Sequence, residues 1–451
     1  MRKRISAFFS VLAAIVLLTV PASAASSGST LKIICADAGQ VIFTPPGSTQ
    51  YAYRYGPAIL IDGDRIDIWA SAPPLVSNGV RYGNDSIEYI RSTDGGKTWT
   101  EWKTVLYPTL NSEDQWSTCD PGAFKYGDYY YVGYTGSPEF RTNPDKEKQV
   151  NNLFIARAKN PEGPYEKWNG NGWGGDPYAI TRYSGDGVGC SMPSFTVKGD
   201  TLYMYYVDQT HPDQDWNSEG NISVSTFSLK DPNWPGNELS NKMCENKPEE
   251  VRYCPDIDKF IGFQLKGGWD YDSYVEIYES TDGVNFTKTS SFRNNFPHYA
   301  HNIGISGNNL GQLDLSIQNY IGTAYTPTGV EAWWGHWHTQ LIPLYIREEQ
   351  PSSTTSSQPS GSTDSSSQKP TTSSVGSTDG ESSETEVSEP QNSNIESTVS
   401  DDKDKDKEVN NKTEQQEETS YLWLYIVIGA VVVLAGAGTA AYFLVIKKKH
   451  V

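Results

Sequence analysis

Residues 119–124 read Cys119-Asp120-Pro121-Gly122-Ala123-Phe124, and they open a unit that recurs in outline along this chain of 451 residues. The unit continues through a Gly127-Asp128 turn into the aromatic run Tyr129-Tyr130-Tyr131-Val132. A short apolar segment, a Gly-Asp turn and a second alternating segment are typical of two antiparallel strands joined by a tight hairpin. A carboxylate, that of Asp120, stands directly before the proline of this unit.

Four further segments repeat this layout with a different residue beside the first strand. They begin at Tyr55-Gly56-Pro57, Ser191-Met192-Pro193, Lys247-Pro248-Glu249 and His301-Asn302-Ile303. The prolines at 57, 121, 193 and 248 lie 64, 72 and 55 residues apart, enough for a four-stranded antiparallel sheet with its loops. We therefore predict an all-β fold, a five-bladed β-propeller in which each proline is the first residue of an innermost strand. A β-sandwich with turns of similar sequence is the alternative.

The two ends of the chain differ from the middle in composition. Residues 1–24 combine a basic start, an apolar segment and small residues at a cleavage point, which is the anatomy of a secretory signal peptide. Residues 421–446 are apolar and long enough to span a bilayer, and the lysines of the 447–451 tail favour a cytoplasmic C-terminus. We therefore predict a single-pass cell-membrane protein whose globular domain, residues 25–347, lies outside the cell.

Residues 348–420 separate the globular domain from the predicted transmembrane helix. They hold 17 acidic and 5 basic residues, so that 12 of the 19 net negative charges of the chain lie here, and they contain no aromatic residue. Such a segment buries too little apolar surface to offset its chain entropy, so we predict a disordered linker. The acidic balance also argues against nucleic acid as a partner.

The chain holds few cysteines for an exported protein of this size, namely Cys35, Cys119, Cys190, Cys244 and Cys254. Their number does not suit a disulfide scaffold, and because it is odd at least one thiol is unpaired, while one or two bridges stay open. Their spacing matches no zinc motif. The sequence indicates no metal and no cofactor, and we predict a monomer.

Two predicted hairpin turns carry a second repeated motif. Ser92-Thr93-Asp94-Gly95-Gly96-Lys97-Thr98-Trp99 forms one, and Ser280-Thr281-Asp282-Gly283-Val284-Asn285-Phe286 forms the other. The side chains of Asp94 and Asp282 can accept hydrogen bonds from the turn backbone, while Trp99 and Phe286 can pack back between sheets. Each hairpin resembles the Asp-box of sialidases and related propellers, which implies a structural role at the rim and no catalytic one.

The residues beside the first strands would surround the central axis of a propeller. Hydrolysis of a glycosidic bond needs one carboxyl group that is protonated and another that is ionised. We therefore predict Asp120 as one catalytic carboxylate and Glu249 or Glu250 as the other. The two glutamates point to opposite faces of a strand, so at most one faces the axis. Arg54, Ser191 and His301 are the candidates for binding substrate.

The first repeat resembles the corresponding part of sialidases, on the segment Tyr53-Arg54-Tyr55-Gly56-Pro57 and on Arg81-Tyr82-Gly83-Asn84-Asp85. The resemblance implies that Arg54 grips an acidic part of the substrate, that Arg81 and Arg252 assist it, and that Asp85 acts as acid or base. Sialidases have six blades, three clustered arginines and a tyrosine nucleophile, so this chain departs from their pattern.

Asp120-Pro121, the following tyrosines and Ala158-Lys159-Asn160-Pro161-Glu162-Gly163-Pro164-Tyr165 are similar instead to five-bladed arabinanases and xylosidases. That family uses two aspartates and a glutamate from three blades, and Asp120 alone matches here. We predict an extracellular, membrane-anchored glycoside hydrolase acting on glycans. A non-catalytic glycan-binding propeller and a surface adhesin stay open. Asp120 as a turn cap, Arg54 in a structural ion pair and His301 as an ordinary polar loop residue are the corresponding alternatives.

Overall fold

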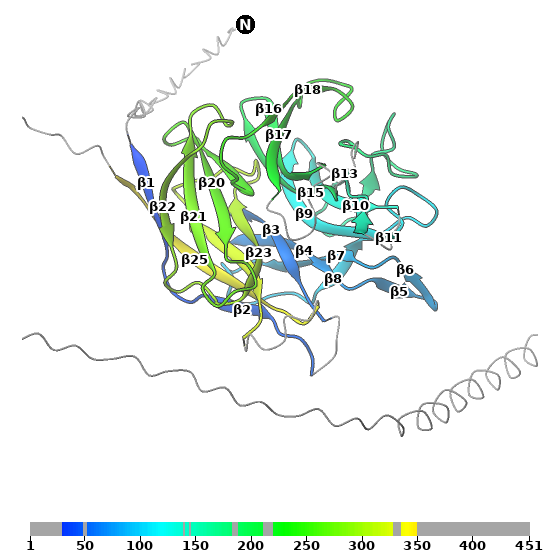
Figure 1. Ribbon diagram of the computed structural model, residues 1–451, viewed down its shortest axis with the longest axis horizontal. Coiled ribbons are helices and arrows are strands. Elements are labelled where there is room, and N and C mark those ends of the chain that lie inside the picture. The colour runs from blue at the N-terminus through cyan, green and yellow to red at the C-terminus, as the bar shows by residue number, and fades with distance from the viewer. Residues whose placement is uncertain are drawn as a thin grey trace, which may run out of the picture. The chain divides into compact units, whose positions relative to one another are not determined.

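A computed structural model gives the structure of this protein (Figure 1). It describes residues 29–47, 52–138, 140–143, 146–182, 188–210, 220–327 and 335–349. These residues form strands and no α-helix, which confirms the all-β prediction. Within them, no helix has the length and apolar character needed to cross a membrane. The predicted signal peptide, linker, transmembrane helix and tail lie outside the described residues, except that the last strand extends through Glu349.

The described strands fall into groups of four that follow one another along the chain, each an antiparallel meander. The first group is β3 (Tyr55–Asp62), β4 (Arg65–Ala72), β7 (Ser86–Ser92) and β8 (Lys103–Leu106), and the second is β9 (Ser117–Tyr126), β10 (Tyr129–Ser137), β13 (Asn152–Ala158) and β14 (Glu166–Lys167). The third is β15 (Gly189–Lys198), β16 (Thr201–Gln209), β17 (Asn221–Ser228) and β18 (Glu238–Met243), and the fourth is β19 (Glu250–Cys254), β20 (Lys259–Lys266), β21 (Tyr274–Ser280) and β22 (Thr287–Phe292). The fifth is β23 (Ala300–Gly307), β24 (Tyr320–Tyr325), β25 (His338–Glu349) and, from the start of the chain, β1 (Thr30–Cys35).

Three short additions complete the sheets. Strand β2 (Gln40–Phe43) also pairs with β25. The hairpins β5 (Leu75–Ser77) with β6 (Val80–Tyr82) and β11 (Phe140–Asn143) with β12 (Lys146–Gln149) form two-stranded sheets of their own. Both hairpins leave the meanders between the second and third strands of a group, in the first group and the second group respectively.

The first strands of the groups contact one another in a closed ring. Strand β3 contacts β9, β9 contacts β15, β15 contacts β19, β19 contacts β23, and β23 returns to β3. The last contact is a short parallel pairing in which Ser306 lies opposite Ile59. Strand β1 brings the N-terminal end of the described chain onto β25, with Ile33 opposite Ile346, so the first and last strands lie in the same group.

The hydrophobic core lies between neighbouring groups. One buried cluster joins each adjacent pair, with Trp69 and Val132 between groups one and two, Phe124 and Phe195 between two and three, Tyr205 and Phe286 between three and four, Ile277 and Ile305 between four and five, and Ile68 and Leu341 between five and one. Since a group packs against a neighbour on both sides, its inner strands are apolar on both faces, as in β3, where every residue from Tyr55 to Ile61 is buried.

The prolines of the repeat occupy a different place from the predicted one. Pro57, Pro121 and Pro193 lie inside β3, β9 and β15, while Pro248 lies just before β19, so none is the first residue of its strand. The strand pairing shifts register beside Pro57, Pro121 and Pro193. A bulge removes the need for a ladder hydrogen bond, which is why a strand tolerates proline there.

Two glycines permit the close approach of neighbouring first strands. A Cβ atom on Gly304 of β23 would lie 1.6 Å from the Pro57 carbonyl oxygen, and one on Gly122 of β9 would lie 2.0 Å from the Pro193 carbonyl oxygen. Both distances are far inside van der Waals contact, so no side chain fits at either position unless the strands separate.

The two repeated turns form the hydrogen bonds that their sequences predict. Asp94 accepts from the backbone N–H groups of Lys97 and Thr98, and Asp282 accepts from those of Val284 and Asn285. The Thr98 hydroxyl is the main cause that lowers the pKa of Asp94 to about 2. The aromatic residues that end the motifs differ in depth, because Phe286 is fully buried whereas Trp99 is half-buried.

The second of these turns gives a stability prediction. Replacing Asp282 by alanine removes acceptors for two backbone N–H groups, and we expect a loss of about 1–2 kcal/mol in the free energy of unfolding. Differential scanning calorimetry should show the midpoint falling by about 2–8 °C. Thr281→Ala is the matched control, because that side chain forms no hydrogen bond with any described residue. Equal midpoints for the two variants would contradict a structural role for the turn.

The cysteines are all buried as free thiols. Burial raises the pKa of each, for example to about 12 at Cys254 and well above its ordinary value at Cys119. The one or two bridges that the sequence left open are not formed.

Candidate functional site

Asp120 lies where three groups meet. It sits at the bulge of β9 with a φ of 49°, and its side chain is half-buried. Its backbone N–H donates to the Ser71 hydroxyl of the first group at 2.7 Å, and its Oδ1 accepts from Asn302 Nδ2 of the fifth group at 3.3 Å. A residue other than glycine in the left-handed region is held there by its surroundings, and such residues gather at functional sites.

The pKa of Asp120 is shifted toward neutral pH. Burial raises its pKa to about 6, and the Asp85 carboxylate adds to the rise, while hydrogen bonds from the Thr135 hydroxyl and the Cys119 thiol oppose it. The Cys119 thiol keeps its proton because its own pKa lies well above the ordinary value, so it acts as a donor to Asp120. A carboxyl group with a pKa near 6 can both give and take a proton at neutral pH.

Asp85 supplies a second carboxylate behind Asp120. It is buried and accepts hydrogen bonds from the Tyr53 hydroxyl at 2.5 Å, the Ser117 hydroxyl at 2.9 Å and Asn84 Nδ2 at 3.2 Å. Burial raises its pKa as well. The Ser117 hydroxyl also lies 3.4 Å from Cys119 Sγ, which in turn lies 3.5 Å from Asp120 Oδ2, so polar groups connect the two carboxylates without a break.

Aromatic rings line the side of the site that faces the fifth group. The His301 ring lies 4.1 Å from that of Trp269, 4.5 Å from that of Trp337 and 5.4 Å from that of Tyr55, measured between centroids. Trp337 and Tyr55 are buried, whereas Trp269 and His301 are half-buried. Burial lowers the pKa of His301 to about 3, so its ring is neutral at ordinary pH. Aromatic faces of this kind stack against the C–H faces of sugar rings and of other amphipathic ligands.

The bulge of β9 has counterparts in three other first strands. Gly56, Met192 and Asn302 also have positive φ, at 56°, 57° and 55°. A Cβ atom on Gly56 would lie 3.5 Å from Asp120 Oδ1 and 3.6 Å from Asn302 Nδ2, so these positions adjoin one another. The Met192 N–H donates to the same Thr135 hydroxyl that bonds Asp120. Ser191 precedes this bulge on β15 and is half-buried.

The two predicted glutamates have partners within the fourth group and its neighbours. Glu250 forms a 2.8 Å ion pair with Arg252 and accepts from the Ser194 hydroxyl at 3.1 Å. Arg252 is buried and also donates to the Ile305 carbonyl and to Ser194, so it joins the third, fourth and fifth groups. Glu249 accepts from the Leu265 N–H at 2.8 Å.

The predicted arginines Arg54, Arg81 and Arg252 each have partners of their own within the chain. Arg54 forms a 2.6 Å ion pair with Glu88, and its guanidinium lies over the rings of Phe43 and Trp102. Arg81 donates to the Gly83 carbonyl and to Asn84 in the loop that carries Asp85. Arg54 thus has the structural ion pair that the sequence left open as its alternative role.

Several residues of this site were not predicted from the sequence. Asn302 comes from a segment 182 positions away from Asp120, and Ser71 and Thr135 look like ordinary strand residues. The sequence did hold one sign of Asn302. When the repeats Cys119-Asp120-Pro121 and His301-Asn302-Ile303 are compared, Asn302 stands in the position of Asp120. Among the described residues, no group of three or more His, Cys, Asp or Glu could hold a metal ion.

No protein-family model and no curated protein matches this chain. Solved structures do match. An α-L-arabinofuranosidase from Podospora anserina in complex with cellotriose shares 11% identity, with 71% of this chain and 98% of the other covered, at a TM-score of 0.45. A family 117 glycoside hydrolase from Zobellia galactanivorans shares 14% identity over 72% and 92%, at 0.46, and an α-L-arabinofuranosidase from Lactobacillus brevis shares 14% over 64% and 90%, at 0.44.

Proposed function

We propose that this chain is a glycoside hydrolase and that Asp120 is the group that moves the proton. The observation that carries this proposal is the Asp120 carboxyl itself, which is half-buried, is held in a strained conformation and has a pKa raised to about 6. Strain and a shifted pKa on one reachable carboxyl group are features of acid–base catalysts.

The chemistry follows from the neighbours of Asp120. In its protonated state it can give a proton to the leaving oxygen of a glycosidic bond, and in its ionised state it can take one from water. Glycoside hydrolysis calls for a second carboxylate, and Asp85 is the one connected to Asp120 through Ser117 and Cys119. Asn302 orients the Asp120 carboxylate, and the half-buried rings of Trp269 and His301 offer a surface for a sugar.

The architecture and the location belong to the same proposal. The closed ring of first strands and the cores between groups support five blades of a β-propeller, with Asp120 beside the central axis. The composition of residues 1–24, 348–420 and 421–446 supports an exported protein that a stalk and a membrane helix hold at the cell surface. Its substrate would then be a glycan outside the cell.

An assay of the full chain tests the proposal. We expect hydrolysis of at least one member of a panel of aryl glycosides of arabinose, xylose, galactose and sialic acid. Since the pKa of Asp120 is about 6, the pH profile of kcat/KM should show an apparent pKa near this value. An active enzyme whose profile is flat between pH 5 and 7 would contradict the role of Asp120.

A glycan-binding protein without catalysis is the second candidate. The observation that favours it is the identity of the residues at the other bulges. Gly56 and Met192 stand where further carboxylates would be needed, and Glu250 is paired with Arg252. Saturable sugar binding measured by calorimetry, together with inactivity on the whole panel, would favour this second function.

A further inference from the structure

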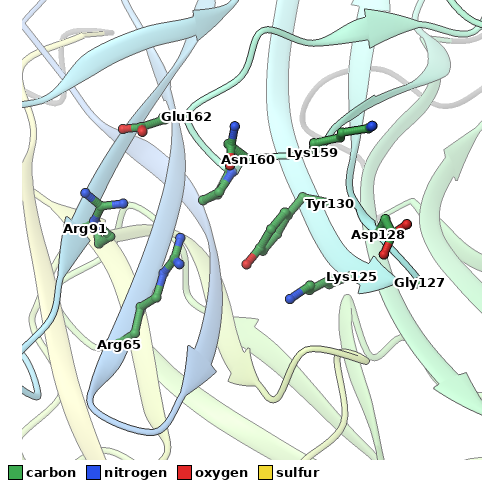
Figure 2. Close-up of a pocket in the computed structure, with 10 residues that line it drawn as sticks. Arg65, Arg91, Lys125, Gly127, Asp128, Tyr130, Lys159, Asn160 and Glu162 are labelled. Carbon is green, nitrogen blue, oxygen red and sulfur yellow. The ribbon is translucent and has the colours of Figure 1, made fainter.

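A cavity of about 280 Å³ lies between the first and second groups, at the far end of β9 from Asp120. Its wall comes from the β3–β4 turn at Arg65, the end of β7 at Arg91, the β9–β10 turn at residues 125–130 and the loop at residues 159–162 (Figure 2). A second depression lined by Lys103 and the 104–105 and 162–164 segments shares Glu162 with it, so the two adjoin.

Positive charge predominates inside this cavity. Arg65, Arg91 and Lys125 are half-buried, whereas the two carboxylates of the lining, those of Asp128 and Glu162, belong to exposed residues. Figure 2 shows Arg65 and Lys125 extending toward the hydroxyl end of Tyr130 from opposite sides, and both lie over its ring, at 5.9 and 4.9 Å from the centroid. Lys159, which is exposed, points away from them in the same view.

Two of the three inner cations lack an ion-pair partner among the described residues. Arg65 pairs with Asp67 at 2.9 Å, but Arg91 and Lys125 form no ion pair within that part of the chain. Arg91 lies opposite Asp67 in the β4–β7 pairing, yet its Nε is buried and has no hydrogen-bond partner on any residue that the structure describes. Arg91 and Lys125 thus bring positive charge to the cavity that no ion pair within the described residues balances, and an anion bound there would supply the counter-charge.

The wall is preformed. The Pro161 carbonyl accepts from Trp69 Nε1 at 3.1 Å and from the Tyr165 hydroxyl at 2.8 Å, and the Gly163 N–H closes the turn on the Asn160 carbonyl at 2.9 Å. Trp69 is fully buried in the core between the first two groups, so the loop cannot shift without disturbing that core. A rigid site loses little conformational entropy when it binds a ligand.

We propose that this cavity binds a tetrahedral oxyanion, phosphate or sulfate, either free or carried on a sugar chain. The cations approach from three strands, which suits an anion with several oxygen faces and about two negative charges better than a single carboxylate. The adjoining depression at Lys103 gives room for the rest of a substituted chain. This site is independent of the Asp120 centre.

Calorimetric titration of the full chain at low ionic strength tests the proposal with inorganic phosphate, inorganic sulfate, dextran sulfate and uncharged dextran. We expect saturable binding of an oxyanion that weakens as NaCl is added, because salt screens the attraction. The double variant Arg91→Gln with Lys125→Gln should weaken this binding by about tenfold or more. Lys97→Gln with Lys242→Gln is the charge-matched control, since both lysines are exposed and lie outside the cavity, and it should change affinity by less than about twofold.

The source of the oxyanion is decided by the same titrations. Binding of the free ions that is lost in the cavity variant supports a site for a free anion. Binding of dextran sulfate alone, again lost in that variant and absent with dextran, supports an oxyanion carried on a sugar chain. No binding of either, or equal weakening in the two double variants, would show the proposal to be wrong. Lys125→Gln alone serves as the test variant if the circular dichroism of the double variant shows that it does not fold.

Discussion

Asp120→Asn is expected to lower kcat by about 10²–10⁴-fold on a substrate that the wild-type chain turns over. Asparagine keeps the shape of the side chain and tolerates the φ of 49°, so the change removes the exchangeable proton and little else. The loss should be larger for a glycoside with a poor leaving group, such as an alkyl glycoside, than for a 4-nitrophenyl glycoside, because only the former needs the proton. Steady-state kinetics on both kinds of substrate measure this difference.

Asp64→Asn is the matched control for this variant, since it removes a carboxylate from an exposed turn of the first group. It should retain wild-type activity and the wild-type pH profile. Turnover by Asp120→Asn equal to that of the control, on both kinds of substrate, would show that Asp120 has no catalytic role.

The Asp120→Asn variant is also expected to be more stable than the wild type at neutral pH. The pKa of Asp120 rises from about 4 in the unfolded chain to about 6 in the folded one, so the folded protein binds more protons in that interval. The free energy of unfolding therefore falls as pH rises from 4 to 6. Above pH 6 the wild type carries the whole cost of burying the ionised Asp120 carboxylate, about 1–3 kcal/mol. Thermal midpoints should differ at pH 7.5 and converge below pH 4.

Gly304→Ala is expected to destabilise the fold by about 3 kcal/mol or more, a larger loss than that expected for Asp282→Ala. The added methyl group would lie 1.6 Å from the Pro57 carbonyl oxygen, and this neighbour is backbone, so β3 and β23 must separate. That separation would break the parallel pairing of Ser306 with Ile59, which closes the ring. Calorimetry should show a fall in the midpoint of about 6–12 °C.

Gly172→Ala is the control for this substitution. It also lacks a positive φ, and nothing lies within 4 Å of the methyl group that it would add. It should leave the midpoint unchanged or slightly raised, because alanine restricts the unfolded chain. If Gly304→Ala unfolded at the same temperature as Gly172→Ala, the first strands of the first and fifth groups would not be in close contact.

Much of the secondary structure could be predicted because its causes are local. The Gly127-Asp128 turn and the alternation around it predict β9 and β10, and the segment that begins at His301 predicts β23. Hairpin turns and a side-chain period of two depend on neighbouring residues alone. The prolines were predicted at strand starts and lie mainly at bulges inside strands, since a register shift depends on the partner strand as well.

The candidate site could be predicted only in part. Asp120 stood out because it is a carboxylate directly before the proline of the repeat, and Asp85 was implied by a resemblance to sialidases. Glu249 or Glu250 was expected at the axis, and Glu250 forms an ion pair with Arg252, a contact that packing decides. Arg54 likewise pairs with Glu88 on another strand of its own group.

By itself, the sequence determined the strands, the two repeated turns and the prominence of Asp120, because each rests on residues within about a dozen positions of one another. The tertiary structure alone decided what surrounds that carboxylate. Asn302 reaches Asp120 from 182 positions away. The contact of β23 with β3, which closes the ring, brings Asn302 to this site, and the bridge between Asp85 and Ser117 joins the first group to the second. Burial between these groups raises the pKa of Asp120, and the Asp85 carboxylate adds to the rise.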